Sequence, residues 1–253
     1  MAIKPHFLVT AGSTHEKIDD VRQWSNIFTG KTGLDVALAL LDLGDVTLLT
    51  SNRQHAVEFD GFYGKGGMLG IETFGSHAEL RDLLQERMTS GDRVDAVAMS
   101  AAVADYQPAG TYRVVKKISL QEAKLDGPPG AQVWVVENVQ APKVRSTHGE
   151  IAVLGTATEK LVDLFRTAWA FRGMLIKFKL EVGISEEELV RVAGESRRAS
   201  GADLIIANTL AMVGGTNAGA YFIDAAGAIR VARTQLAAEM RERVVRQLGT
   251  PRS

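Results

Sequence analysis

Two segments near the N-terminus have the composition of an anion-binding turn. Residues 10–14 (TAGST) are small, so a phosphate group can approach their backbone N–H groups. Residues 21–33 (VRQWSNIFTGKTG) offer a cation, an amide, hydroxyls and two glycines before a predicted helix, whose N-terminus would attract anions. A plain loop with a glycine-assisted helix start is the alternative interpretation. Both segments favour phosphate binding by backbone groups over covalent catalysis.

A third segment, residues 101–108 (AAVADYQP), places two alanines directly after an apolar run. A ligand can lie against a backbone that carries such small side chains, and Asp105 can accept hydrogen bonds from it. Lys116 and Lys117 follow, and an ammonium group can neutralise charge that develops on a phosphate. This segment therefore predicts a site for a phosphorylated substrate.

The fourth site pairs residues 176–181 (IKFKLE) with residues 206–208 (IAN). Phe178 can stack on a nucleobase and Asn208 can bind its edge, although core packing is the simpler interpretation of Phe178 by itself. Together the four segments indicate nucleotide chemistry.

Familiar nucleotide and metal motifs are incomplete in this sequence. Residues 30–32 (GKT) resemble the end of a P-loop, but Ser25 stands where that loop needs a glycine. The turn at Gly12 lacks the second and third glycines of a dinucleotide fingerprint, and residues 64–69 lack the last one. These gaps disfavour a dehydrogenase. The five histidines show no metal-ligand spacing, so the metal ligands stay unknown.

The elements that must position these segments alternate along the chain. Short apolar runs, typical of buried parallel strands, lie at residues 6–11, 46–50, 94–101, 151–155, 174–180 and 203–208. Helical spacing occurs at residues 34–41, 77–88, 158–172, 185–200 and 234–248. The alternation predicts an α/β fold, a three-layer, Rossmann-like, doubly wound and mainly parallel sheet whose carboxyl edge would gather the four segments.

Other features concern loops, hairpins and charges. We predict loops at residues 61–70 and 124–130, and interpret Asp19-Asp20 and Glu186–Glu188 as solvated or capping charges. Residues 112–120 with 132–137 predict a β-hairpin arm suited to dimerisation, and residues 221–224 with 229–232 a second hairpin. We see no interdomain linker and expect a single domain over residues 1–253.

Composition narrows the class of protein. The chain has 253 residues, a formal net charge of −1 and no cysteine, which excludes disulfides, thiolate metal sites and a cysteine nucleophile. A near-neutral charge argues against binding to nucleic acid or to a membrane surface. Without a signal-like or membrane-spanning apolar stretch, we expect a cytoplasmic protein.

Taken in order, TAGSTHEKIDDVR, WSNIFTGKTG, SAAVADYQP, KKI, IKFKLEVGISEEEL and DLIIAN resemble the phosphopantothenoylcysteine synthetase (phosphopantothenate-cysteine ligase) family of coenzyme A biosynthesis. The resemblance implies a Rossmann-like homodimer that requires Mg²⁺. It also implies a ligase that joins 4′-phosphopantothenate to cysteine through an acyl-nucleotide made from CTP or ATP. Family members are often fused to a flavin-dependent decarboxylase that uses a cysteine. Because this chain lacks cysteine and begins at the ligase motif, we expect a stand-alone ligase part without FMN.

The resemblance also implies residue roles. Asn26 would hold the acyl carbonyl of the intermediate, and Lys117, or alternatively Lys116, would stabilise the nucleotide. Arg22 would reach a substrate phosphate across the dimer interface. The phosphopantothenate site would be lined by Ala101, Ala102 and Asp105, and the nucleotide site by Gly12, Thr29, Gly30, Gly33, Pro142, Lys143, Phe178 and Asn208.

Several positions depart from the family pattern. Ser13 and Phe28 replace a usual glycine and serine, Thr209 replaces a frequent aspartate, and Ser196 and Ser200 replace lysines. These departures leave other interpretations open: a divergent paralogue with an altered substrate, or a non-catalytic Rossmann-like nucleotide-binding protein. An NAD(P)-dependent reductase is the least favoured alternative. The choice between CTP and ATP also stays open.

Overall fold

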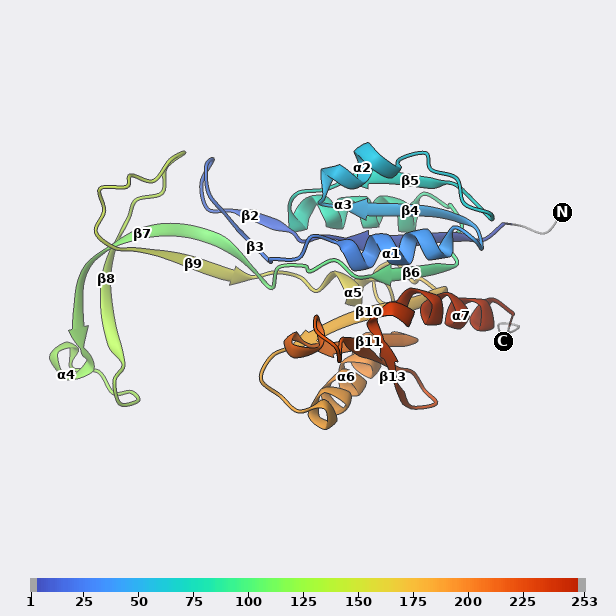
Figure 1. The fold of residues 1–253 in the computed structure, drawn as a ribbon. Coiled ribbons are helices and arrows are strands. Elements are labelled where there is room, and N and C mark those ends of the chain that lie inside the picture. Colours follow the sequence, from blue (N-terminus) through green and yellow to red (C-terminus); the bar gives the residue numbers. More distant parts are fainter. Residues whose placement is uncertain (1–3, 250–253) are drawn as a thin grey trace. The chain divides into compact units, whose positions relative to one another are not determined.

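The structure, a computed structural model, describes residues 4–249 and forms two compact units (Figure 1). Unit 1 comprises the chain up to Thr14, residues 27–103 and the chain from Lys160, and unit 2 comprises residues 15–26 and 104–159. The chain therefore leaves unit 1 twice and returns to it twice. A single domain over residues 1–253 stays a prediction, since an inserted unit is compatible with it.

Unit 1 is built on an eight-stranded sheet of order β13-β12-β11-β10-β6-β1-β4-β5. The strands are β1 (His6–Ala11), β4 (Asp45–Thr50), β5 (Leu69–Thr73), β6 (Ala96–Met99), β10 (Met174–Glu181), β11 (Leu204–Thr209), β12 (Gly219–Ile223) and β13 (Ala228–Ala232). The six strands from β11 to β5 pair in parallel, and β12 and β13 pair antiparallel. The predicted doubly wound sheet and the predicted second hairpin are confirmed.

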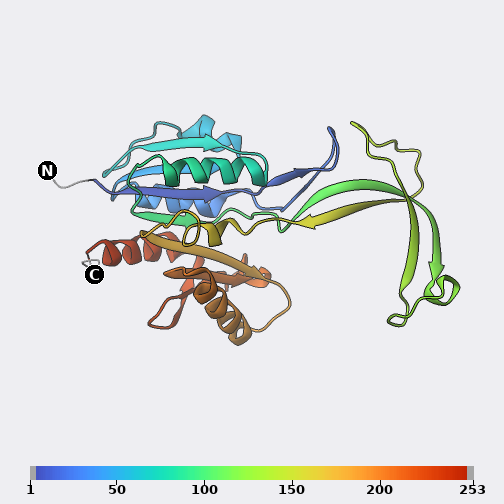
Figure 2. The ribbon, with the colours of Figure 1, turned by 180° about the vertical axis from the view of Figure 1, so that it is seen from behind.

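Helices cover both faces of this sheet. They are α1 (Lys31–Leu40), α2 (Arg53–Phe59), α3 (His77–Thr89), α5 (Leu161–Leu164), α6 (Glu186–Ser200) and α7 (Leu236–Gly249). Side chains alternate along a strand, so Phe7 and Val9 of β1 belong to the core cluster that includes α1 and α7, whereas Leu8 belongs to the cluster that includes α3 and α5. Figure 1 shows α1 in front of the sheet, and Figure 2, from behind, shows α3 in front.

Helix ends follow local sequence signals. The Ser185 hydroxyl accepts a hydrogen bond from the Glu188 N–H at the start of α6, as predicted for a capping serine, and α6 ends at Gly201 with φ of 63°. Ser76 and Glu79 form a reciprocal capping box on α3. Within the described residues, no helix is long and apolar enough to cross a membrane.

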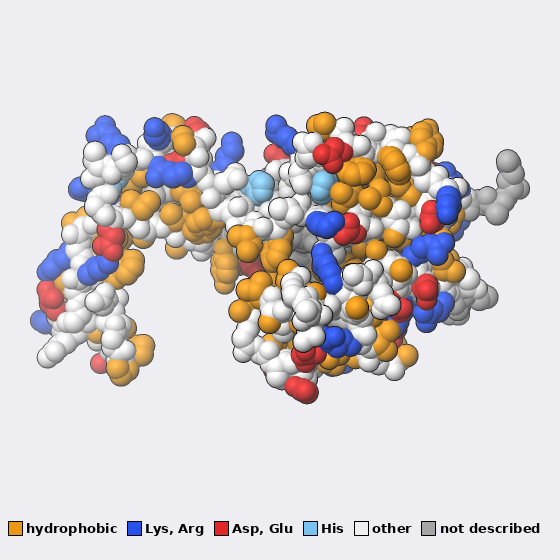
Figure 3. All heavy atoms as spheres, in the orientation of Figure 1, with side chains coloured by type: hydrophobic (Ala, Val, Ile, Leu, Met, Phe, Trp, Pro, Cys, Tyr) orange, Lys and Arg blue, Asp and Glu red, His pale blue; other side chains and the backbone are white. Residues whose placement is uncertain are grey.

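Unit 2 contains a three-stranded antiparallel sheet of order β8-β7-β9. Its elements are β2 (His15–Lys17), β3 (Gln23–Ser25), β7 (Tyr106–Ser119), α4 (Leu120–Ala123), β8 (Gln132–Asn138) and β9 (Ile151–Ala157). The pairing of β7 with β8 confirms the predicted hairpin arm. Hydrophobic side chains gather on the surface of this sheet, where Trp134, Val135 and Leu154 are about half exposed (Figure 3).

Two sequence predictions about elements were wrong. Residues 151–155 were assigned to the parallel sheet, but they form β9 and pair antiparallel with β7, because an apolar run does not specify its partner. Residues 158–172 were expected to be one helix, but only α5 is helical, and Ala170 has φ of 47°, which a right-handed helix cannot contain. Helix α2 and most of β5 were not predicted from the sequence.

Candidate active site

Three glycines shape the turn between β1 and α1. Gly12 and Gly30 have φ of 87° and 85°, and a Cβ atom on Gly30 would lie 2.5 Å from the Gly12 nitrogen. A Cβ atom on Gly33 would lie 2.6 Å from Ala11 Cβ, so α1 approaches β1 more closely than another residue would allow. These are the tasks of the three glycines in a nucleotide-binding fingerprint: a tight turn, close backbone approach, and helix-strand packing.

The fingerprint was missed because its spacing is interrupted. Residues 15–26, which belong to unit 2, separate Gly12 from the Gly30-Lys31-Thr32-Gly33 turn. A search for glycines at fixed spacing therefore fails, although the glycines meet in space. The signal that remains in the sequence is a glycine after the first strand and a GxxG at the start of the first helix.

The loop after β6 is bound to the turn after β1. The Ala102 N–H donates to the Gly12 carbonyl (2.8 Å), and the Ala102 carbonyl accepts from the Thr14 N–H (3.2 Å). The Ser100 hydroxyl donates to the Thr10 carbonyl (2.6 Å). Since β1 and β6 are neighbours whose following helices cover opposite faces, this edge is the switch point where such sheets bind ligands.

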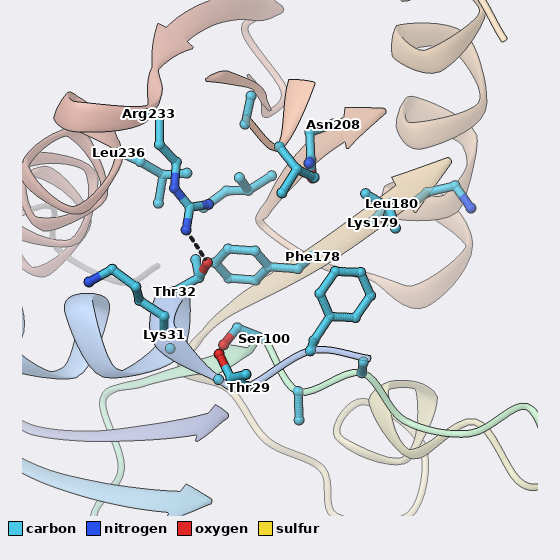
Figure 4. A pocket seen from close by; sticks show the side chains of 18 of the residues that line it. Thr29, Lys31, Thr32, Ser100, Phe178, Lys179, Leu180, Asn208, Arg233 and Leu236 are labelled. Atoms are coloured by element: carbon cyan, nitrogen blue, oxygen red, sulfur yellow. Dashed lines mark hydrogen bonds between the residues drawn. The ribbon is translucent and has the colours of Figure 1, made fainter. Parts of the chain in front are cut away.

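A cavity of about 300 Å³ opens at this edge within unit 1, at the lower end of the size range of small-molecule sites. Eight residues predicted to bind ligand line it, namely Gly12, Thr29, Gly30, Gly33, Ala101, Ala102, Phe178 and Asn208. Figure 4 shows Phe178 on β10 and Asn208 on β11 directed toward the space above α1. The structure therefore brings together most of the predicted nucleotide site, whereas Pro142 and Lys143 lie in unit 2.

The charged residues that line the cavity are all cationic. They are Lys31, Lys179 and Arg233, and no acidic side chain lines the cavity in the described part of the chain. Lys31 and Lys179 have acidic partners nearby, at 3.3 Å and 2.7 Å. Lys179 lies in the predicted segment 176–181 but was given no role there, and nothing in the local sequence of Arg233 marks it as a site residue. Such a cavity suits a polyanionic ligand.

A hydrogen-bond network that runs inward to the buried His55 supports the cavity wall at Thr29. The Asn52 amide donates to the Thr29 carbonyl (3.1 Å) and lies 3.1 Å from His55 Nε2. His55 Nδ1 lies 3.0 Å from the Thr50 hydroxyl. Because the amide nitrogen is a donor, Nε2 must accept, which assigns the proton of the neutral ring to Nδ1. Burial lowers the pKa of His55, in keeping with a neutral ring.

The structure shows what surrounds each position that departs from the family pattern. Phe28 lines the cavity, and the Ser13 N–H donates to the Ser51 hydroxyl (2.9 Å). Ser196 accepts a hydrogen bond from Lys177 Nζ (2.9 Å), and the pKa of Lys177 is lowered by burial. Ser200 bonds to the α6 backbone, and Thr209 is buried at the end of β11. Of these positions only Phe28 faces the cavity.

In unit 2, Asn26 and Asp105 share a hollow of about 330 Å³. Trp24, Ser25, Ala104, Tyr106 and Gly155 complete its lining. The Ala104 and Asp105 carbonyls accept hydrogen bonds from the Thr158 hydroxyl (2.5 Å) and N–H (3.0 Å), which hold the Asp105 backbone beside β9. Two residues assigned to substrate contact from separate motifs thus lie at one site.

The two candidate lysines have different surroundings on β7. Lys116 Nζ donates to Glu122 (2.8 Å), and its side chain is 60% exposed. Lys117 Nζ donates to Glu150 and lies 4.6 Å from the centre of the Trp134 ring, which leaves its side chain 33% exposed. Within unit 2, therefore, Lys117 has the more specific surroundings.

Arg22 is held by an acidic residue of its own unit. Its guanidinium donates twice to Asp19 Oδ2 (3.0 and 2.5 Å) and once to the Val144 carbonyl (2.6 Å). Asp19 Oδ1 accepts from the Val21 and Arg22 N–H groups. The interpretation of Asp19 as a solvated charge is wrong: its side chain is buried, and the Arg22 guanidinium holds the pKa of Asp19 well below its usual range.

Comparison with known proteins agrees with this geometry. A family model described as "DNA/pantothenate metabolism flavoprotein C-terminal domain" matches residues 3–126. The solved structure of the DNA/pantothenate metabolism flavoprotein from Streptococcus pneumoniae is 27% identical, with a TM-score of 0.70, and the similarity covers 96% of this chain and 99% of that one. The family model thus covers about the first half of this chain, and the structural similarity extends over nearly all of it. The resemblance to phosphopantothenoylcysteine synthetases is thereby confirmed.

The curated proteins that this chain resembles are longer proteins. The bifunctional coenzyme A biosynthesis protein CoaBC of Thermococcus kodakarensis is 28% identical over 207 residues, which are 82% of this chain and 42% of the relative. CoaBC of Mycobacterium tuberculosis H37Rv is 32% identical over 160 residues, 60% of this chain and 34% of the relative. The chain thus spans less than half the length of the curated relatives it matches.

Proposed function

We propose that this chain carries phosphopantothenate-cysteine ligase activity. The observation that carries the proposal is the cationic cavity of unit 1, lined by the glycine turn and by Phe178 and Asn208. Its charge suits a nucleoside triphosphate better than a neutral substrate. The bifunctional relatives are named for coenzyme A biosynthesis, which requires such a ligase.

The reaction needs no nucleophilic side chain. The carboxylate of 4′-phosphopantothenate attacks the α-phosphorus of CTP or ATP, an acyl-nucleotide forms, and pyrophosphate leaves. The amine of cysteine then attacks the acyl carbon and loses a proton as the amide forms. The bond between the acyl carbon and the phosphate oxygen breaks, and CMP or AMP leaves. Catalysis of both steps rests on positioning and on charge neutralisation. The absence of cysteine from the chain is compatible with this chemistry.

Unit 1 would bind the nucleotide. Backbone N–H groups at the glycine turn would contact its phosphates, because no side chain stands in the way at Gly12 and Gly30. The half-buried Phe178 ring would pack on the base, and the Asn208 amide would bind the base or ribose.

Mg²⁺ would arrive with the triphosphate. Among the described residues no group of three or more metal-ligating side chains occurs, and no carboxylate lines the cavity. This donor set fits a Mg²⁺ ion held by phosphate oxygens and water, which is its common mode in nucleotide sites. When bound, the ion would neutralise phosphate charge.

Asn26 and Asp105 of unit 2 would contact the acid substrate. The Asn26 amide can donate to the acyl carbonyl, and Asp105 can accept from hydroxyl or amide groups of the pantothenate part. Lys117 would stabilise the nucleotide after leaving its ion pair with Glu150. These roles follow the family pattern at matching residues.

The partner would be a second copy of the chain. The sheet of unit 2 exposes apolar side chains, including Tyr106, Trp134 and Leu154, which a soluble protein usually covers. A homodimer would cover them. Sedimentation equilibrium tests this, and a monomer at micromolar concentration would contradict it.

The decisive assay supplies 4′-phosphopantothenate, cysteine and Mg²⁺ with CTP or ATP in turn, and follows pyrophosphate together with CMP or AMP. We expect release of both products, and at least ~100-fold slower turnover of Asn26→Asp, as for the loss of a preorganised donor. Nucleotide binding without turnover would favour a non-catalytic nucleotide-binding protein. Turnover with another acid would favour a divergent paralogue.

A further inference from the structure

Arg233 differs from the other two cations of the cavity. Its guanidinium has no acidic partner in residues 4–249, whereas Lys31 and Lys179 are each paired. Its Nη2 donates a hydrogen bond to the Thr32 hydroxyl (2.8 Å). A guanidinium has five N–H donors, and within residues 4–249 one donor of Arg233 is bonded to a protein acceptor.

The order of the elements in the fold brings Arg233 to the cavity. It begins the short 3-10 turn Arg233–Gln235 between β13 and α7, and the Arg233 N–H donates to the Ala218 carbonyl (3.0 Å). The side chain is half-buried and reaches a residue 201 positions earlier in the chain. Figure 4 shows its guanidinium directed at Thr32, across the cavity from Asn208. Its backbone anchor and its position above α1 thus fix the guanidinium at the cavity wall.

We propose that Arg233 binds the phosphate chain of the nucleoside triphosphate, the part that leaves as pyrophosphate. This inference rests on the proposed function. A planar guanidinium suits paired hydrogen bonds to phosphate oxygens, and it stays charged at every physiological pH. An unpaired arginine beside a glycine turn is a positioning residue for the triphosphate, and it would lower the charge that builds up on the departing pyrophosphate.

Binding of a graded set of ligands tests the proposal. Titration calorimetry at fixed Mg²⁺ compares CTP, CMP, ATP, AMP and inorganic pyrophosphate on wild type, Arg233→Gln and Arg233→Lys. We expect Arg233→Gln to weaken the binding of triphosphates and pyrophosphate by about 10- to 100-fold, the range for a lost charged hydrogen bond. Monophosphate binding should stay within about twofold. Arg233→Lys keeps the charge without the planar fork and should show a smaller loss with the same selectivity.

Arg230→Gln is the matched control. Arg230 lies on β13, pairs with Glu186 (3.4 Å) and does not line the cavity, so this variant should bind every ligand as wild type does. A purely structural role of Arg233 would weaken monophosphates and triphosphates alike and lower the melting temperature. That result, or unchanged triphosphate binding by a folded Arg233→Gln, overturns the inference. If Arg233→Gln does not fold, Arg233→Lys decides by the same criterion.

The failure of this inference is distinguishable from failure of the proposed function. Wild-type chain that binds neither CTP nor ATP overturns both. Wild-type chain that binds them and releases pyrophosphate, with Arg233→Gln unimpaired, overturns only the assignment of Arg233.

Discussion

Replacing Gly33 by alanine is expected to destabilise unit 1, although alanine is the better helix former. Gly33 is the third residue of α1 and is buried against the end of β1. An added methyl group would lie 2.5 Å from Ser100 Oγ, 2.6 Å from Ala11 Cβ and 2.8 Å from the Thr10 carbonyl oxygen. Relief requires α1 to move away from β1, or Ser100 to give up its hydrogen bond to Thr10.

Two opposing effects set the magnitude. Alanine gains up to about 1 kcal/mol over glycine in a helix. Overpacking of a buried site costs about 1–3 kcal/mol, and loss of the Ser100 hydrogen bond costs about 1 kcal/mol more. Overlap with strand atoms should outweigh the gain in helix propensity. We expect a net loss of about 2 kcal/mol in the free energy of unfolding.

Urea denaturation followed by far-ultraviolet circular dichroism measures this loss in unit 1, because the one helix of unit 2 in the described chain is the four-residue α4. Gly194→Ala is the matched control. Gly194 is also buried in a helix, but an added methyl group there would meet Arg198 Nη1 at 3.5 Å, an ordinary contact. That variant should be more stable than wild type by about 0.5–1 kcal/mol.

The two substitutions should therefore change stability in opposite directions. If Gly33→Ala is as stable as wild type to within about 0.5 kcal/mol, the close packing of α1 on β1 is wrong. A destabilised Gly194→Ala would instead show that helix propensity and the space around a glycine do not predict the change in stability in this fold.

Three further predictions concern titration and charge. Burial lowers the pKa of His55, so the unfolded state binds the proton more readily, and thermal stability should fall as pH drops below about 6.5; a His55→Gln variant with an equally steep melting profile would contradict this. Arg22 lowers the pKa of Asp19, so the ionised Asp19 should stabilise unit 2 above about pH 4, and this stabilisation should be lost as the pH falls below that value. Unfolding of Asp19→Asn by acid, followed by tryptophan fluorescence, should therefore depend less steeply on pH than that of wild type. Lys117→Gln should slow cysteine-independent pyrophosphate release by about 100-fold while Lys116→Gln stays near wild type, and the reverse order would move the assignment by one residue.

Much of the fold could be predicted because its signals are local. The buried runs of β1, β10 and β11, the hairpin of β7 with β8, and the capping serine of α6 each depend on residues within a few positions of one another. Strand β9 shows where this stops. Its apolar run marks a strand, but pairing with β7 depends on a partner more than thirty positions away, which periodicity does not encode.

The candidate site divides in the same way. The types and spacing of the residues were enough to predict that small residues after strands would bind phosphate. They were also enough to select Phe178, Asn208 and the two alanines after β6 as ligand-binding residues. Only the tertiary structure decided that Gly12 and Gly30 touch across an inserted segment, and that Arg233 faces Thr32. The physical reason is that secondary structure follows from nearby residues, whereas a binding site is made by strand order, which brings together groups that chain distance keeps apart.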